Sequence, residues 1–400
     1  MSRSYSYRHW TKRLAAFGLD TLGNLLTVPW RFSQKPLETR NIKKILAVRL
    51  DPLGDVIMTM PAIRALGREF PDWQIDFLTS SECAPLVENF PGIHELLSFK
   101  KDWFRHKPSA ATWREARLLI SELRARRYDL AIDFRGDLRN ILLLTLAGIP
   151  RRLGYGITGG GFLLTDQEDY APQEHRILLN FRLLRRLGLK PEIPPVNFPH
   201  TLAQEEDFRN RFGQIRSSGN RPRIVMHTSA GYPSKRWPSE KFIALIQKII
   251  SEDLGEVVLI GNERETLGGE ASFEKEGLTD LRGKTSLRDL GILFEACDLF
   301  VGNDSGPAHL AAAQGLSLVI LFSGTNDWRL WHPWTQKLKP VYHEVPCSPC
   351  HEKICPLGHH DCMKKIEVEE AFEAVKKALA AIEAAERKSK SFSRAEAATP

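Results

Sequence analysis

Short apolar runs alternate with longer segments of helical spacing from residue 41 to residue 199. The runs read KKILAVRL, QIDFLTS, HELLSF and YDLAIDF, and residues 112–127 have the pattern of a helix. Strands that alternate with helices predict a parallel sheet covered on both faces. We therefore expect an α/β fold that begins with a Rossmann-like domain over residues 41–199.

The same alternation starts again after a break in the pattern. Residues 200–222 include a charged stretch followed by SSGNRP, and this composition predicts a linker between domains. The runs RIVMHTSA, EVVLIGN, CDLFVGNDSG and LSLVILFSG then predict a second Rossmann-like domain over residues 223–365. Residues 366–388 are rich in Ala, Glu and Lys and predict a C-terminal helix, with a disordered tail over 389–400.

Residues 1–40 have the pattern of a basic amphipathic segment. Apolar side chains recur at roughly helical spacing between two tryptophans, at Trp10, Leu14, Phe17, Leu22, Leu25, Leu26 and Trp30. The segment holds seven basic residues against two acidic ones, which is five of the seven net positive charges of the chain. This placement predicts a local anionic partner, such as a peripheral membrane surface, and argues against a broad nucleic-acid-binding surface. A helix packed on the protein itself, or a solvated basic leader, are the alternatives.

Apolar content and cysteine usage bear on the compartment. No stretch reaches the ~18 consecutive apolar residues that span a bilayer, and the N-terminus lacks the pattern of a cleaved signal peptide. Six cysteines, four of them close together near the C-terminus, do not resemble a disulfide framework spread through a secreted fold. We expect a cytoplasmic protein.

The first expected strand ends in RLDPLGD, where chemistry is predicted. Ligands of parallel α/β sheets bind beyond the carboxyl ends of the strands. Gly54 is expected to permit a tight turn there and to deliver Asp55 to the start of the next helix. Asp55 could act as a general base, or it could only cap the helix.

Three loops of the second domain predict a site for a nucleotide diphosphate. Lys235 lies in a small-residue loop beside Arg236 and suits phosphate oxygens, although plain surface charge is the alternative. Either Glu263 or Glu265 is expected to accept hydrogen bonds from ribose hydroxyls. The loop NDSG opens a helix whose N-terminus predicts an anion cradle, contributed by Asp304, Ser305, Gly306 and His309. No segment matches GxGxxG, which gives a dinucleotide dehydrogenase little support.

Together, LDPLGDVIMTMPAIRALGREFP, the SKRWP box, GKTSLRDLGIL and VGNDSGPAHLAAAQG resemble glycosyltransferase family 9, the heptosyltransferases of the lipopolysaccharide core. The resemblance implies a GT-B architecture, in which two Rossmann-like domains enclose the active site in a cleft. It also implies a metal-independent, inverting transfer from ADP-heptose to the lipopolysaccharide inner core, at the inner face of the inner membrane. In this scheme Asp55 is the general base and Lys235 binds the donor diphosphate, while Ser305, Gly306 and His309 bind that diphosphate or its sugar.

Two further groups of residues are candidates for binding. Four cysteines within residues 347–362 have a spacing that predicts a structural zinc or iron site, with reduced thiols or local disulfides as alternatives: Cys347, Cys350, Cys355 and Cys362. Two basic segments are candidates for contacting acidic groups of the acceptor: Arg105, His106 and Lys107, and then Arg135, Gly136 and Arg139.

The alternatives to heptose transfer are a transferase of the same fold with another nucleotide sugar or acceptor, and a non-catalytic scaffold for cell-envelope assembly. The acid at position 55 favours an enzyme over a scaffold.

Overall fold

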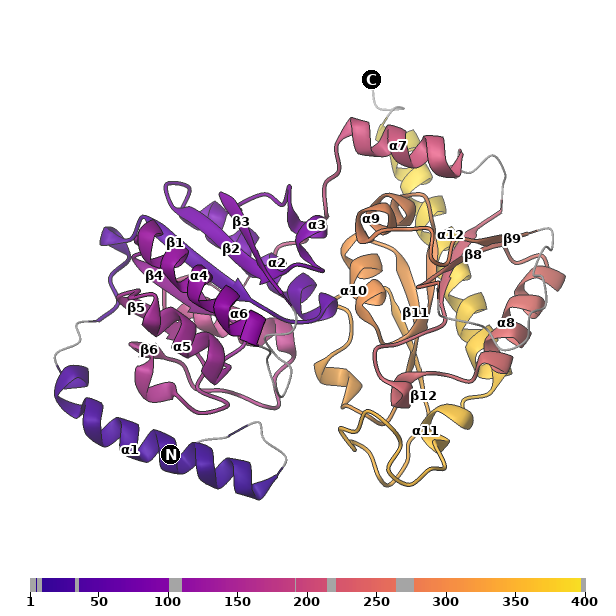
Figure 1. Ribbon diagram of the computed structural model, residues 1–400. Helices are drawn as coiled ribbons and strands as arrows, with labels where there is room; N and C mark the ends of the chain where they lie inside the picture. Colours follow the sequence, from indigo (N-terminus) through magenta and orange to yellow (C-terminus); the bar gives the residue numbers. More distant parts are fainter. Residues whose placement is uncertain are drawn as a thin grey trace. The chain divides into compact units, whose positions relative to one another are not determined.

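The computed structural model describes residues 5, 9–32, 36–100, 110–190, 192–213, 221–263 and 277–396, without the side chains of 28–32 and 388–396. The chain divides into two compact units, Met1–Val196 and Asn197–Pro400. Figure 1 shows a parallel sheet with helices in each of them. The predicted α/β class is confirmed.

The first unit contains a six-stranded parallel sheet in the order β3-β2-β1-β4-β5-β6. Apolar runs such as the one in β1 form its centre, where the side chains are almost completely buried on both faces. The strands are β1 (Lys44–Arg49), β2 (Gln74–Ser80), β3 (Glu95–Phe99), β4 (Leu130–Asp133), β5 (Arg151–Gly154) and β6 (Asp166–Gln167). The helices are α1 (Trp10–Phe32), α2 (Leu53–Glu69), α3 (Ala84–Val87), α4 (Ala110–Arg126), α5 (Leu138–Leu146) and α6 (Arg176–Arg185), with short 3-10 turns η1 (Thr39–Asn41) and η3 (Gly161–Leu163).

The second unit repeats this topology. Its parallel sheet has the order β12-β11-β10-β7-β8-β9, so the fourth strand of each sheet again pairs with the first. The strands are β7 (Arg223–His227), β8 (Glu256–Ile260), β9 (Leu278–Asp280), β10 (Leu299–Asn303), β11 (Ser317–Phe322) and β12 (Leu338–Tyr342). The helices are α7 (Leu202–Phe212), α8 (Ser239–Ser251), α9 (Leu287–Glu295), α10 (Gly306–Ala313), α11 (Asp361–Lys364) and α12 (Val368–Glu396), with the 3-10 turns η4 (Pro233–Lys235) and η5 (Trp328–Leu330). Helix α12 packs with α8 on one face of the sheet.

Most of the predicted linker is in fact part of the second unit. Helix α7 occupies half of residues 200–222 and begins with a capping box between Thr201 and Gln204. Its Arg211 pairs with Asp289 on α9, which attaches the helix to the second unit. The boundary between the units therefore falls earlier, at Val196.

The predicted tail also begins too early. Helix α12 continues to Glu396, through the first eight residues of the segment 389–400. This segment contains no glycine, and its only proline is the last residue, so nothing in it breaks the helix. Residues 397–400 lie outside the described part of the chain.

Both sheets change direction at their first strand, between β1 and β4 in one unit and between β7 and β10 in the other. Loops leave in opposite directions at such a switch point, and the crevice between them is the usual ligand site of open α/β sheets. In each unit, a ligand is therefore expected at the carboxyl ends of these two strands. Among the described residues, no helix combines the length and apolar character needed to cross a membrane.

Candidate active site

Asp55 lies at the switch point of the first unit, in the first turn of α2. Its carboxylate is 2.8 Å from a guanidinium nitrogen of Arg49, the last residue of β1. Arg49 also pairs with Asp51 at 2.9 Å and donates to the backbone carbonyl of Phe134 beyond β4. The Asp55 side chain remains 19% exposed, so it is held in place by Arg49 and still open to a ligand.

A second cluster of charges follows β4, the neighbouring strand. Asp133 is fully buried and accepts hydrogen bonds from the backbone N–H groups of Arg135 and Gly136 and from Asn140. Burial raises the pKa of Asp133 to about 6. Burial also lowers the pKa of the Arg135 guanidinium to about 10. Arg135 pairs with Asp51, so the loops after β1 and β4 form one charged network around Asp55.

Asp137 begins α5 and is bound by the second predicted acceptor-binding arginine. It caps the helix by accepting from the backbone N–H of Arg139, whose guanidinium is 2.9 Å away. Burial alone would raise the pKa of Asp137, but the hydrogen bonds and charge of Arg139, with the charge of Arg135, lower it overall. Arg135 and Arg139 are about one third exposed, which leaves part of each guanidinium accessible to an anion.

The expectation for Gly54 is wrong. Gly54 is the second residue of α2 and does not have the positive φ that would require glycine. The chain turns before it, where Pro52 occupies the N-cap position of the helix. Gly136, by contrast, has a φ of 76°, and an added Cβ would come within 2.5 Å of the Tyr155 carbonyl oxygen. The candidates Arg105, His106 and Lys107 lie outside the described residues.

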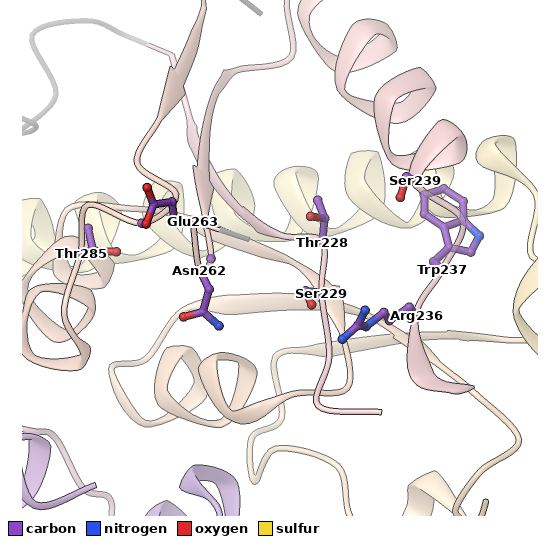
Figure 2. A pocket seen from close by; sticks show the side chains of 10 residues that line it. Thr228, Ser229, Arg236, Trp237, Ser239, Asn262, Glu263 and Thr285 are labelled. Carbon is purple, nitrogen blue, oxygen red and sulfur yellow. The ribbon is translucent and has the colours of Figure 1, made fainter. Parts of the chain in front are cut away.

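A cavity of about 710 Å³ opens at the carboxyl ends of β7 and β8 in the second unit. Its walls combine hydroxyl groups, one amide, one carboxylate and one guanidinium, and they include Thr228, Ser229, Arg236, Trp237, Ser239, Gly261, Asn262, Glu263, Gly283 and Thr285. Figure 2 shows Glu263 and Thr285 on one side, Trp237 and Ser239 on the other, and Thr228 and Ser229 between them. Ser239 is the first residue of α8, so a helix N-terminus adds its partial positive charge to this wall.

The predicted anion cradle lies next to this cavity, at the end of β10. Ser305 is the N-cap residue of α10 but makes no side-chain capping hydrogen bond; its hydroxyl is instead 3.1 Å from Nδ1 of His227, at the end of β7. Gly306 opens the helix. His309 is buried in its first turn, with 7% of its surface exposed.

Lys235 and Asp304 form an ion pair beside this helix, with 2.5 Å between Nζ and Oδ2. The two side chains are 16% and 10% exposed. Asn303 connects the cradle to the cavity, because its side chain accepts from the Trp237 backbone N–H and donates to the Thr228 carbonyl. Of the predicted donor-binding residues, Glu263 lines the cavity. Asp304, Ser305, Gly306 and His309 lie with Lys235 in the adjacent cradle or in the first turn of α10. Glu265 lies outside the described residues.

The cysteine-containing loop braces the residue that precedes Lys235. Ser234 donates its backbone N–H to the Lys353 carbonyl and its hydroxyl to the Glu352 carbonyl, 118 positions along the chain. His360 contacts the Ser234 carbonyl through Nε2 at 2.9 Å. The loop that contains the cysteines therefore packs directly against the loop that contains Lys235.

The four cysteines are free thiols, and three of them lie close enough to Cys362 to act on its charge. Burial raises the pKa of the Cys362 thiol, and the other three cysteines raise it further. Among the described residues, the group whose possible ligand atoms converge within 4.8 Å is Asp76, His94 and Glu95, and not the cysteines. Arg126 already pairs with Glu95 in that group, and Tyr128 donates to Asp76. Zinc or iron at the four cysteines stays a prediction.

Several residues of the site escaped the sequence analysis. Arg49, which holds Asp55, is a cation that follows four consecutive apolar residues at the end of β1, and this contrast is a usable signal. The hydroxyls of Thr228, Ser229 and Thr285 gave no such signal, because threonine and serine are common in loops of every kind.

Comparison with known proteins agrees with this geometry. The family model described as glycosyltransferase family 9 (heptosyltransferase) matches residues 116–360. Lipopolysaccharide heptosyltransferase 2 of Escherichia coli K12 is 28% identical over 322 residues, which cover 76% of this chain and 90% of that protein. Lipooligosaccharide heptosyltransferase 2 of Campylobacter jejuni is 25% identical over 81% of this chain and 96% of its own length.

A solved structure shows the same arrangement of elements. The structure of the E. coli ADP-heptose lipopolysaccharide heptosyltransferase II is 25% identical, has a TM-score of 0.68, and covers 85% of this chain and 99% of its own. The family model matches more than half of the chain, and the relatives and the strand-end site agree with that match. The chain belongs to glycosyltransferase family 9, the heptosyltransferase family, and is a glycosyltransferase.

Proposed function

We propose that this protein transfers a heptose from ADP-heptose to the inner core of lipopolysaccharide, with inversion at the anomeric carbon. The observation that carries the proposal is the cavity of about 710 Å³ at the strand ends of the second unit. Its carboxylate, hydroxyls and guanidinium match the ribose and diphosphate of a nucleotide sugar. The curated relatives are named as lipopolysaccharide and lipooligosaccharide heptosyltransferases, which supports this donor and acceptor.

The second unit supplies the donor chemistry. Glu263 accepts hydrogen bonds from the ribose hydroxyls, and Arg236 and Lys235 bind the diphosphate. Bond cleavage places negative charge on the departing ADP, and preorganised cations and helix N-termini stabilise that charge without a metal. Helices α8 and α10 both have their N-termini at the carboxyl-end edge of the second sheet.

The first unit supplies the acceptor chemistry. Asp55 takes the proton from the attacking acceptor hydroxyl as that oxygen bonds to the anomeric carbon opposite the departing ADP. Arg49 orients the Asp55 carboxylate. Arg135 and Arg139 bind acidic groups of the acceptor.

Release of ADP from ADP-heptose, measured with a set of truncated lipopolysaccharide acceptors, tests donor, acceptor and base together. We expect acceptor-dependent release that falls by about two or more orders of magnitude in Asp55→Ala. Asp72→Asn is the matched control, because Asp72 is an exposed acid of the same unit and should keep wild-type turnover. No turnover with any acceptor, despite a folded protein, would contradict the proposal.

The same assay separates the alternatives. Nucleotide release from another ADP-, UDP- or GDP-sugar in place of ADP-heptose would indicate a transferase of this fold with a different donor. Absence of release with every donor and acceptor would indicate a non-catalytic scaffold.

The proposed place of action is the inner face of the inner membrane, with the protein bound peripherally. The acceptor is a lipid-linked saccharide, so the enzyme has to work beside a bilayer. The basic residues of the N-terminal segment, seven in the first forty positions, support contact with anionic headgroups.

A further inference from the structure

Helix α1 turns one face, made of small and polar residues, toward the rest of the first unit. Ala16, Asp20 and Gly23 recur at helical spacing on one face, and all three are buried. A Cβ added to Gly23 would come within 2.4 Å of the Phe162 ring in η3, so the helix and this turn approach closely. The inner face of α1 is thus shaped for contact with the protein, although it contains no large apolar side chain.

A buried carboxylate fixes this helix in place. Asp20 is 1% exposed and accepts hydrogen bonds from the Gly160 backbone N–H at 2.7 Å and from the Tyr5 hydroxyl at 2.8 Å. Asp20 is also the only acidic residue between positions 9 and 32. Its burial leaves the exposed surface of this helix without a negative charge.

The opposite face of α1 exposes the large apolar residues. Six of them have exposed fractions between 56% and 74%, and we call these six the outer face: Trp10, Leu14, Phe17, Leu22, Leu25 and Leu26. A helix on the surface of a soluble protein normally buries its apolar stripe and exposes its polar one. Here the arrangement is reversed, and the exposed cations Lys12 and Arg13 lie on the same helix. The helix thus does pack on the protein, as the alternative has it, but through its small and polar face and not through its large apolar residues.

We propose that the outer face of α1 docks on an anionic lipid bilayer, with the helix axis in the plane of the headgroups. Exposed large apolar side chains that accompany a basic segment are the pattern of interfacial helices. A second copy of the chain is the less favourable occupant, because each copy would bring five net positive charges from its first forty residues. The inference rests on the proposed function, in which the acceptor is lipid-linked.

Docking through α1 would bring the acceptor-binding loop to the lipid surface. The turn that holds Asp20 continues into contact with α5: the Thr158 hydroxyl accepts from the Leu138 backbone N–H at 2.7 Å. Asp137 and Arg139 lie directly beside this contact, at the start of α5. A short, hydrogen-bonded path thus connects the lipid-facing helix with the arginine proposed to bind the acceptor.

Co-sedimentation with vesicles tests this inference. The vesicles contain phosphatidylethanolamine with about one third phosphatidylglycerol, and phosphatidylcholine vesicles serve for comparison. We expect the full chain to bind the anionic vesicles and Leu14→Glu/Leu25→Glu to bind at least tenfold less. The matched control is Leu118→Glu/Leu202→Glu, which adds the same charge at exposed leucines of α4 and α7 and should bind like the wild type.

Two further measurements keep the outcomes distinct. Turnover with a soluble, delipidated acceptor should be unchanged in Leu14→Glu/Leu25→Glu, which shows that the variant is folded. Vesicle binding needs no turnover, so it still tests docking through the outer face of α1 if the protein lacks heptosyltransferase activity. Equal binding by the wild type and the α1 variant would overturn the inference, as would equal loss in the control. Self-association through α1 without vesicle binding, seen by analytical ultracentrifugation, would identify a second copy as the occupant and also overturn it.

Discussion

Replacement of Lys235 with methionine should separate the structural role of this residue from its role in binding diphosphate. The lysine ammonium is 2.5 Å from the Asp304 carboxylate, and neither side chain is more than 16% exposed. Removal of one partner leaves a nearly buried carboxylate unpaired, at a cost of about 3 kcal/mol. For a unit of about 200 residues this is a fall in Tm of about 6–12 °C. Lys235→Met/Asp304→Asn removes both charges and should recover most of that loss.

Catalysis should not recover in the same way. Both variants lack the cation that we propose stabilises the departing ADP, so turnover should stay about 10²–10³-fold below wild type even in Lys235→Met/Asp304→Asn. Urea unfolding, calorimetry with ADP and initial rates of ADP release measure the two effects separately. If the double variant regained turnover together with Tm, Lys235 would be a structural residue only. If Lys235→Met bound ADP as tightly as the wild type, diphosphate binding by Lys235 would likewise be refuted.

Three further predictions concern groups described above. The pKa of Asp133 is raised from 3.8 to about 6 in the folded state, so this carboxyl's contribution to folding is fully present below pH 4 and is lost as the pH rises through 6. The free energy of unfolding of the wild type relative to Asp133→Asn should thus fall by about 2–3 kcal/mol from pH 4 to pH 7, and a constant difference would contradict this. Glu263→Gln should weaken ADP binding about tenfold in calorimetry, through loss of a charged acceptor for ribose; an unchanged Kd would remove the role. The spacing of the four cysteines predicts about one equivalent of zinc or iron in protein purified without chelator, and less than about a tenth of an equivalent by elemental analysis would refute the metal site.

The two sheets could be predicted from the sequence because their strands are buried on both faces. Such strands give continuous apolar runs, as in β1 and β11, and these runs alternate with helices at regular intervals. The linker was misplaced because α7 is mostly polar: a helix that buries little except Phe208 resembles a solvated loop in its composition. Its capping box was the local signal that could have identified it.

The candidate site was predictable where backbone geometry fixes it and less so where side chains meet. The strand-end positions of Asp55, Glu263 and Ser305 follow from the rule that ligands bind beyond the carboxyl ends of parallel strands. The pairing of Lys235 with Asp304 joins loops 69 positions apart, and no local pattern specifies such a contact. Arg49 likewise ends a strand and pairs with Asp55. The sequence pattern predicts the strand end but not the pairing.

The brace between Ser234 and the loop at residues 352–360 gives the cysteine-bearing segment a mechanical task that needs no ion. Ser234 is held at its N–H, its hydroxyl and its carbonyl by that segment, and the next residue along the chain is Lys235. A deletion around residues 350–360 would remove none of the described strands but would release Ser234 at its N–H, its hydroxyl and its carbonyl. If Lys235 binds the donor as proposed, such a deletion would weaken donor binding while the two sheets stay folded, so residues far from the donor in sequence would control how firmly it is held.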